Sequence, residues 1–330
     1  MTGSFQAYEV SEGEDGKFSG QIVDRQVDQL PAGEVLVQVQ YSCLNYKDAL
    51  SNSGNRGVTR EFPHTPGIDA AGVVKASETD RYSPGQEVIV SGYDLGMNTS
   101  GAFAEMIRTP ADWVLPLPKG LSARESMIIG TAGFTAAQCV EKLMHNGLEA
   151  GNGPVLVTGA SGGVGIMAVA LLAKLGFSVT ASTGKQASHE LLKSLGAAEV
   201  IDRNALSEAN PRPMLKQQWA GAVDVVGGVT LSNVVKSLRY GGSVACCGLV
   251  ESPEFPATVF PFILRAANLL GIDSAEAPPE KKIALWQRLA TDWKPGALED
   301  IATEITLDQL SESLDNVLCG QALGRFLLRL

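Results

Sequence analysis

The sequence predicts an α/β protein with two domains: a doubly wound parallel sheet and a second domain of mostly short strands. Three observations predict this class. A chain of 330 residues is long enough for two hydrophobic cores. A glycine-rich turn separates an apolar strand from an apolar helix at residues 154–176. Strand and helix patterns then alternate, whereas the first third of the chain reads as strands and turns.

The segment 154–176, PVLVTGASGGVGIMAVALLAKLG, is the strongest signal in the chain. Residues 155–158 form a short apolar strand pattern, and apolar residues recur at helical spacing from Ile166 until a stop near Gly176. The glycines between them are Gly159, Gly162, Gly163 and Gly165.

In this context, glycine allows a tight turn and a close approach of the backbone to a pyrophosphate. The following helix offers free N–H groups to that pyrophosphate. The motif predicts a Rossmann-type dinucleotide site with contacts from Ser161, Gly162, Gly163 and Val164. The alternative is an ordinary glycine-rich turn between buried elements.

The rest of the second domain follows the same alternation. Repeated alternation of strands and helices predicts a parallel sheet with helices on both faces. We expect strands at 177–182, 199–202, 222–226, 243–248 and 268–273, and helices at 187–195 and 231–238.

The first domain is expected to be a small β-barrel-like unit. Residues 34–41 alternate apolar and polar side chains, and turn residues precede apolar runs within 62–74 and 82–91. A helix from Ser122 to Met144 should begin with a capping box of Ser122 and Glu125 and be interrupted by glycines at 130 and 133. A helix at 280–291 and a last strand at 325–330 should complete the first domain. The expected domains are 1–122 with 273–330, and 123–272.

Composition excludes several classes of function. A net charge of −10 and a pI near 4.9 argue against nucleic acid and anionic membranes as partners. The five cysteines form no C-x-x-C pair, which indicates reduced thiols rather than a disulfide framework or a thiolate zinc site. No secretory signal pattern or membrane-length apolar run is present, so a cytoplasmic location is expected.

The end of the second strand favours NADPH over NADH. An NAD site usually places a carboxylate there for the ribose 2′-hydroxyl, but residues 181–185 read Ala-Ser-Thr-Gly-Lys. Lys185 and, after the third strand, Arg203 suit a 2′-phosphate, unless both are solvated surface charges. The predicted contacts of this region are Ser182, Thr183, Gly184, Lys185 and Arg203.

Further cofactor contacts are predicted where parallel strands end, because ligands bind at the carboxyl edge of such sheets. This rule selects Leu249, which could instead pack within its loop, and Ser274, which could instead be an exposed turn residue. Thr131 is a third candidate, on the nicotinamide side. Cys246 and Cys247 lie within a predicted strand and are interpreted as small buried hydrophobic residues.

The order of motifs resembles a known family over essentially the full chain. It contains NYKDAL (45–50), PGIDAAG (66–72), GTAGFTA (130–136), TGASGGVG (158–165) and GIDS (271–274). This series is similar to the zinc-independent quinone oxidoreductase branch of the medium-chain dehydrogenase/reductase superfamily, and most resembles its acrylyl-CoA reductase group. The resemblance implies a GroES-like catalytic domain, a Rossmann domain, NADPH and a homodimer.

The motifs also imply that no metal is bound. Zinc-dependent relatives carry a cysteine where this sequence has Asn45, and a His-Glu pair where it has Ile68-Asp69. Cys43 lies nearby but would lack partner ligands. Of the three histidines only His64 lies near the motif, and we interpret it as a turn or surface residue.

Without a metal, the expected chemistry is conjugate reduction of an α,β-unsaturated carbonyl compound. The resemblance implies that Tyr46 hydrogen-bonds cofactor or substrate and that Asn45 orients the nicotinamide or substrate. Tyr46 could instead be a packing aromatic at a helix start. Asp48 is expected to cap or pair within its helix.

Three readings of the function remain open. The first is an NADPH-dependent reductase of a short enoyl-CoA, most simply acryloyl-CoA to propanoyl-CoA, with Arg56 and Arg60 as loop cations for the CoA phosphates. The second is a quinone or enone reductase that acts on an uncharged acceptor. The third is an NADPH-binding sensor or structural component with little catalysis.

Overall fold

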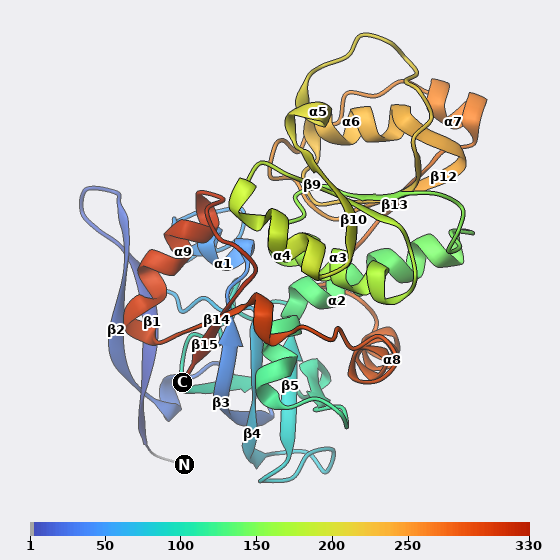
Figure 1. The fold of residues 1–330 in the computed structure, drawn as a ribbon. Coiled ribbons are helices and arrows are strands. Elements are labelled where there is room, and N and C mark those ends of the chain that lie inside the picture. Colours follow the sequence, from blue (N-terminus) through green and yellow to red (C-terminus); the bar gives the residue numbers. More distant parts are fainter. Residues whose placement is uncertain (1–2) are drawn as a thin grey trace. The chain divides into compact units, whose positions relative to one another are not determined.

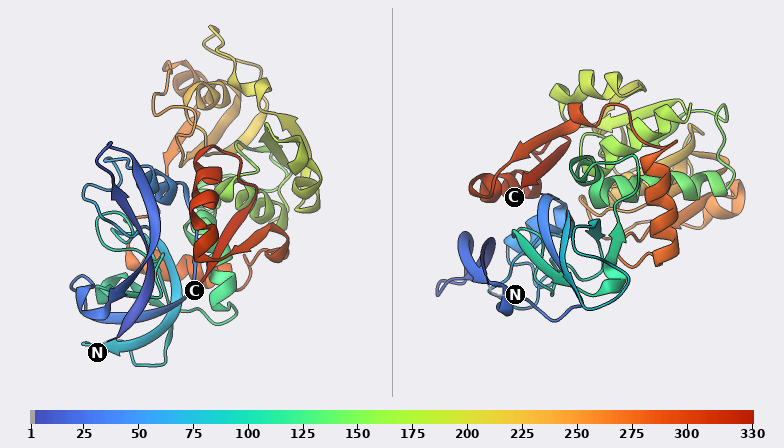
Figure 2. Two further views of the ribbon diagram at one scale, coloured as in Figure 1. Left: turned by 90° about the vertical axis from the view of Figure 1, so that its left-hand side faces the viewer. Right: turned by 90° about the horizontal axis from the view of Figure 1, so that it is seen from below.

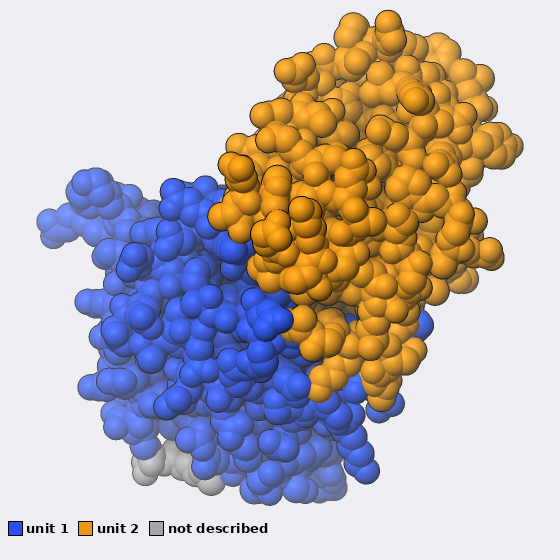
Figure 3. Space-filling view, viewed as in Figure 1, with its two compact units in different colours: residues 1–131, 275–290, 298–330 blue, residues 132–274, 291–297 orange. Residues whose placement is uncertain are grey.

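The computed structural model describes residues 3–330, so the first two residues of the expected first domain lie outside the described part. The chain divides into two compact units (Figure 3). Unit 1 comprises 1–131, 275–290 and 298–330, and unit 2 comprises 132–274 and 291–297. The sequence placed the first boundary at 122/123, whereas unit 1 extends to Thr131, where a long helix is broken at the preceding glycine.

Unit 2 contains a six-stranded sheet in which every neighbouring pair is parallel (Figure 1). The order of strands is that of a doubly wound sheet, which confirms the predicted class. The strands are, in spatial order, β10 (Ala197–Asp202), β9 (Val179–Thr183), β8 (Val155–Val157), β11 (Trp219–Asp224), β12 (Leu238–Cys246) and β13 (Asn268–Gly271).

Helices alternate with these strands as the apolar spacing predicts. α5 and α6 pack with β8, β11 and β12 around a core that includes Leu206, Trp219 and Val234. The helix expected at 187–195 is shorter, because a 3₁₀ turn, Gln186–Ser188, precedes it. The helices are α3 (Gly163–Lys174), α4 (His189–Ser194), α5 (Asn204–Ser207), α6 (Gly228–Ser237) and α7 (Phe260–Arg265).

Unit 1 is built on a seven-stranded, mostly antiparallel sheet in the order β14-β15-β3-β4-β5-β7, with β6 paired to β3 beside β15. A separate hairpin consists of β1 (Ser4–Glu12) and β2 (Phe18–Gln26). The sheet strands are β3 (Val35–Cys43), β4 (Asp69–Ser77), β5 (Glu87–Ser91), β6 (Met106–Thr109), β7 (Val114–Pro116), β14 (Ala302–Ile305) and β15 (Arg325–Arg329).

The end of the chain returns to the sheet formed by its beginning. β15, in red in Figures 1 and 2, pairs antiparallel with β3, and α9 (Leu310–Leu318) packs on α1 (Tyr46–Asn52). Leu314 and Leu328 therefore share a core with Leu44 and Ala49. α8 (Pro279–Ala290) corresponds to the helix expected at 280–291.

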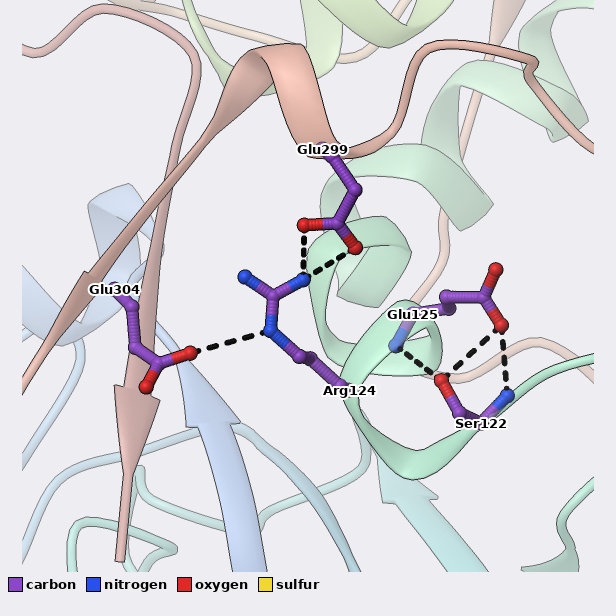
Figure 4. Close-up of polar contacts among 5 residues, drawn as sticks. All are labelled: Ser122, Arg124, Glu125, Glu299 and Glu304. Atoms are coloured by element: carbon purple, nitrogen blue, oxygen red, sulfur yellow. Dashed lines mark hydrogen bonds and ion pairs between the residues drawn. The ribbon is translucent and has the colours of Figure 1, made fainter.

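The long helix α2 (Ala123–His145) begins where its capping residues predict (Figure 4). Ser122 and Glu125 form the expected capping box: the Ser122 N–H donates to the Glu125 carboxylate at 2.9 Å, and the Glu125 N–H donates to Ser122 Oγ at 3.2 Å. Arg124 next to them pairs with Glu299 and, at 3.2 Å, with Glu304 of β14. The helix is broken at Gly130 alone, and continues through residue 133.

The search for helices long and apolar enough to cross a membrane found none within residues 3–330.

Candidate functional site

The NYKDAL motif forms the start of α1, with Asn45 as its N-cap residue. The Asn45 N–H donates to Asp48 Oδ2 at 2.8 Å, and Asp48 Oδ1 accepts the N–H groups of Gly67 and Ile68 at 3.1 and 3.0 Å. Asp48 therefore caps its helix and ties it to the segment before β4, as expected. Burial raises the pKa of Asp48 to about 7.

Asp69, the first residue of β4, is the acceptor at the centre of a buried polar cluster. Its Oδ2 accepts the Thr131 N–H at 2.9 Å and Asn45 Nδ2 at 2.8 Å, and the Cys43 thiol donates to it at 3.2 Å. Its Oδ1 accepts the Thr131 hydroxyl at 2.8 Å. The carboxylate thus lies at the N-terminus of the second half of α2, where a helix dipole stabilises negative charge.

Arg325, at the start of β15, provides the positive charge of this cluster. Its side chain is 3% exposed. It donates to Cys43 Sγ at 2.9 Å, to Asn45 Oδ1 at 3.4 Å, and to the carbonyls of Ile128 and Leu44. Arg325 is 282 residues from Cys43 in the chain, and no local pattern in the sequence pointed to it.

Gly130 makes room for the cluster. Its φ of +49° is a conformation that side chains disfavour. A Cβ at this position would lie 2.6 Å from Cys43 Sγ, 2.8 Å from Arg325 Nη2 and 3.0 Å from Asp69 Oδ2. The glycine that interrupts α2 is thus required both by backbone conformation and by close approach.

The residues of this cluster do not fit a zinc ion. A guanidinium lies against Cys43 Sγ, and burial and Asp69 raise the pKa of this thiol, whereas zinc binds a thiolate. Within the described range, no group of three or more His, Cys, Asp and Glu side chains is arranged to hold a metal. His64 is buried rather than on the surface, and its Nε2 bonds the Gly96 carbonyl at 3.0 Å.

The predicted residues of unit 1 have different surroundings. Tyr46 is 37% exposed, so its phenol is accessible and is not a core aromatic. The amide of Asn45 is held on both sides, by Asp69 and Arg325. The hydroxyl of Thr131 bonds Asp69 and Ser91. Arg56 is paired with Glu12 at 2.5 Å and stacks on two phenylalanines, so its charge is already balanced.

In unit 2 the glycine loop has the close packing that its sequence predicts. Gly162 is the N-cap of α3, whose first N–H groups have no acceptor within the helix. A Cβ on Gly165 would lie 2.3 Å from the Gly159 carbonyl, which shows how tightly helix and turn approach. Ser161 Oγ and Thr183 Oγ1 lie 2.9 Å apart, so the loop is tied to the tip of β9.

Lys185, just beyond the tip of β9, lies near Arg203, which follows β10. Arg203 packs over Gly184, where an added Cβ would lie 2.6 Å from its Nε. Burial, with the neighbouring Arg203, lowers the pKa of Lys185. Thr183 Oγ1 accepts the Lys185 N–H at 3.1 Å and orients this turn, while Ser182 is buried. The arrangement fits an anionic group such as a 2′-phosphate, because it holds two cations together in an acidic protein.

Two other predicted contacts lie at ends of strands. Leu249, just after β12, is 56% exposed and is not packed within its loop. Ser274 is the last residue of the long segment of unit 2 and is partly buried.

Cys246 and Cys247 are partly rather than fully buried, and burial raises the pKa of Cys246 to about 11, so this thiol is a poor nucleophile.

Asp224, at the end of β11, is a residue of this region that the sequence reading missed. It is buried and accepts Thr158 Oγ1 at 2.7 Å and the Gly227 N–H at 2.8 Å, which joins the ends of β8 and β11 beside the glycine loop. Burial raises its pKa to about 6.

The chain is similar to known proteins over nearly its whole length. The family model of the alcohol dehydrogenase GroES-like domain matches residues 31–119, and that of zinc-binding dehydrogenase matches residues 163–291. The chain is 46% identical to the probable acrylyl-CoA reductase AcuI of Escherichia coli K12, over 96% of this chain and 98% of the relative. It is 44% identical to acrylyl-CoA reductase AcuI of Ruegeria pomeroyi, over 94% of each. The crystal structure of E. coli K-12 YhdH with bound NADPH superposes with a TM-score of 0.95 at 45% identity, over 98% of this chain and 99% of the other.

We predict that Asp224 makes stability depend on pH. Its pKa of about 6 in the folded protein exceeds the value near 4 of an unfolded aspartate. The folded state therefore binds this proton more tightly, and the contribution of the group to stability is present below about pH 4 and is lost as pH rises through about 6. Relative to Asp224→Asn, which cannot titrate, the wild type should lose about 1 kcal/mol between about pH 5 and pH 7, and about 3 kcal/mol in full.

Urea unfolding of both proteins across this pH range measures the difference. The lost hydrogen bond in the variant adds a constant offset and does not alter the slope. A difference that stays constant with pH would contradict the prediction.

Proposed function

Because the chain belongs to the acrylyl-CoA reductase (AcuI) family of medium-chain oxidoreductases, we propose that it reduces acryloyl-CoA to propanoyl-CoA with NADPH. The observation that supports a reductase without a metal is the buried cluster of Asp69, Asn45, Cys43 and Arg325, in which the Arg325 guanidinium donates to Cys43 Sγ, the atom that zinc would need as a thiolate. Bound NADPH supplies a hydride to the β-carbon of the acyl group, and the α-carbon then takes a proton.

We assign the contact with the reacting ligands to Tyr46 and a positioning role to Asn45. Tyr46 follows the N-cap of α1 directly and has an accessible phenol that can donate to the developing enolate oxygen. Asn45 has its amide bound to Asp69 and Arg325, so it fixes the start of α1 and thereby the place of Tyr46. Thr131, which bonds Asp69 in the same cluster, is proposed as a contact on the nicotinamide side.

In unit 2, the proposed contacts fall into groups that face different parts of the cofactor. The N–H groups at the start of α3, with Ser161, Gly162, Gly163 and Val164, suit the pyrophosphate. Ser182, Thr183, Gly184, Lys185 and Arg203 suit the adenosine ribose and its 2′-phosphate. Leu249 and Ser274 are proposed to line the nicotinamide half, since both follow the carboxyl ends of strands.

The first prediction concerns the substrate. Purified protein should oxidise NADPH in the presence of acryloyl-CoA much faster than with a benzoquinone, and chelator treatment should not lower this rate because the Arg325 guanidinium occupies the Cys43 thiol that zinc would need as a ligand. The absorbance of NADPH reports the reaction, and metal analysis of the same sample reports zinc. A preference for the quinone would move the function to the alternative of a quinone or enone reductase, and stoichiometric zinc would contradict the proposed metal-free site.

The second prediction concerns cofactor choice. Lys185→Ala and Arg203→Ala should each weaken NADPH binding by about tenfold, since a charged hydrogen bond to phosphate is lost from a partly exposed site. NADH binding should change little, because NADH has no 2′-phosphate. Titration of NADPH and NADH by fluorescence measures both affinities. Lys193→Ala, an exposed lysine that pairs with Glu190, is the matched control. Equal losses for NADH and NADPH would exclude a role in recognising the 2′-phosphate.

We also propose a homodimer formed through the edge of the unit 2 sheet. Among residues 3–330, β13 pairs only with β12, so its other edge is open in this part of the chain. Close to it in the chain, α7 and the residue before it expose large apolar side chains: Val259, Phe260, Ile263 and Leu264, of which Ile263 is 68% exposed. A second copy of the chain would bury these side chains.

The third prediction follows from this interface. Light scattering coupled to gel filtration should give twice the mass of the chain, and Ile263→Asp should shift the protein towards the monomer because a buried charge opposes association. Lys193→Ala again serves as the control. A monomeric wild type would contradict the proposed dimer.

The five free cysteines are consistent with a proposed cytoplasmic location, where thiols stay reduced.

A further inference from the structure

Lys282, on α8, is the one lysine within residues 3–330 whose side chain is buried, at 2% exposure. Burying an ammonium group is costly unless its protons are satisfied. Lys282 Nζ donates to the Ser91 carbonyl at 2.9 Å and to the Ala275 carbonyl at 3.0 Å, and it lies 3.3 Å from the centre of the Tyr93 ring. The ring in turn stacks on Trp113. Two carbonyl acceptors and an aromatic ring arranged around one buried ammonium group indicate a defined role for this charge.

The two carbonyls lie at or next to the points where the chain leaves unit 1 and returns to it. Ala275 is the first residue of unit 1 after the long segment of unit 2, residues 132–274. Ser91 ends β5, and its hydroxyl lies 3.0 Å from the hydroxyl of Thr131, the last residue of unit 1 before that segment. The bonds of Lys282 and Ser91 therefore hold Ala275 and Thr131, the two residues that flank the nucleotide-binding segment, at one point of unit 1.

The backbone around this point is shaped to allow the attachment. Gly92 has a φ of +78°, and a Cβ there would lie 3.0 Å from the Ala275 carbonyl oxygen and 3.1 Å from Lys282 Nζ. Tyr93 has a φ of +55°, which is uncommon for a residue with a side chain, and its N–H donates to the Ala275 carbonyl at 3.1 Å. Such a conformation persists only where its surroundings hold it in place.

This attachment point is continuous with the candidate site. Thr131 donates its N–H and its hydroxyl to Asp69, which also accepts from Asn45. A hydrogen-bonded chain thus runs from Lys282 through the residues Ser91 and Thr131 to Asp69.

We propose that Lys282 is a positioning residue for hydride transfer. It holds Thr131 and Ala275, the residues of unit 1 that flank the segment proposed to bind NADPH, beside Asp69 and Asn45, which place Tyr46. The proposal rests on the proposed reductase function, in which Tyr46 contacts the reacting ligands. Misplacement by about 1 Å can slow such a transfer by about a hundredfold without weakening the binding of either reactant.

The test is Lys282→Met, which keeps the length and apolar stem of the side chain and removes its donors. With acryloyl-CoA and saturating NADPH, kcat should fall by about tenfold to a hundredfold, while the NADPH dissociation constant stays within about twofold. The rate ratio between NADPH and NADPH dideuterated at C4 should rise, because hydride transfer becomes rate-limiting. Lys281→Met, an exposed neighbour on the same helix, should match the wild type.

Ser91→Ala covers the case in which Lys282→Met does not fold, because it removes only the hydroxyl link to Thr131. It should raise the isotope ratio in the same direction and by less. A folded Lys282→Met or Ser91→Ala with the wild-type kcat and isotope ratio would overturn the proposal, as would a loss of NADPH affinity that accounts for the whole fall in rate. If the wild type prefers a quinone, the proposed substrate fails, and the same ratios measured with the quinone still decide the role of Lys282.

Discussion

The carboxylate of Asp69 is the group on which the structure of unit 1 depends. It is buried and accepts hydrogen bonds from the Thr131 N–H and hydroxyl, from Asn45 Nδ2 and from the Cys43 thiol. A buried carboxylate is tolerated only when its lone pairs are matched in this way. Through these four bonds, one side chain of β4 joins β3, the start of α1 and the second half of α2.

Arg325 extends this constraint to the end of the chain. Its guanidinium reaches Cys43 and Asn45 from β15, so the C-terminal strand is attached to the same cluster by charge as well as by its pairing with β3. An amide held by a carboxylate on one side and a guanidinium on the other has a single orientation. The polar groups at the start of α1, next to Tyr46, are therefore held in fixed orientations.

The glycine loop of unit 2 is shaped mainly by close approach of the backbone. Gly162 begins α3, and the close contact of Gly165 with Gly159 leaves no space for larger side chains. The bonds from Ser161 to Thr183 and from Thr158 to Asp224 then fix the glycine loop against the neighbouring strand ends. In a protein with ten more acidic than basic side chains, Lys185 and Arg203 place two cationic side chains near each other beside Gly184.

The sequence by itself determined the local features of this protein. The glycine loop, the cap of α2 by Ser122 and Glu125 and the alternation of strands and helices follow from backbone sterics and periodicity within short windows. The absence of a carboxylate at the tip of β9 is read directly from the residues there. Only the tertiary structure decided the composition of the polar cluster. Cys43 meets Arg325 across 282 residues, Lys282 meets Ser91 across 191, and Asp69 meets Thr131 across 62. Such contacts depend on the path of the whole chain, which no spacing within a motif can reveal.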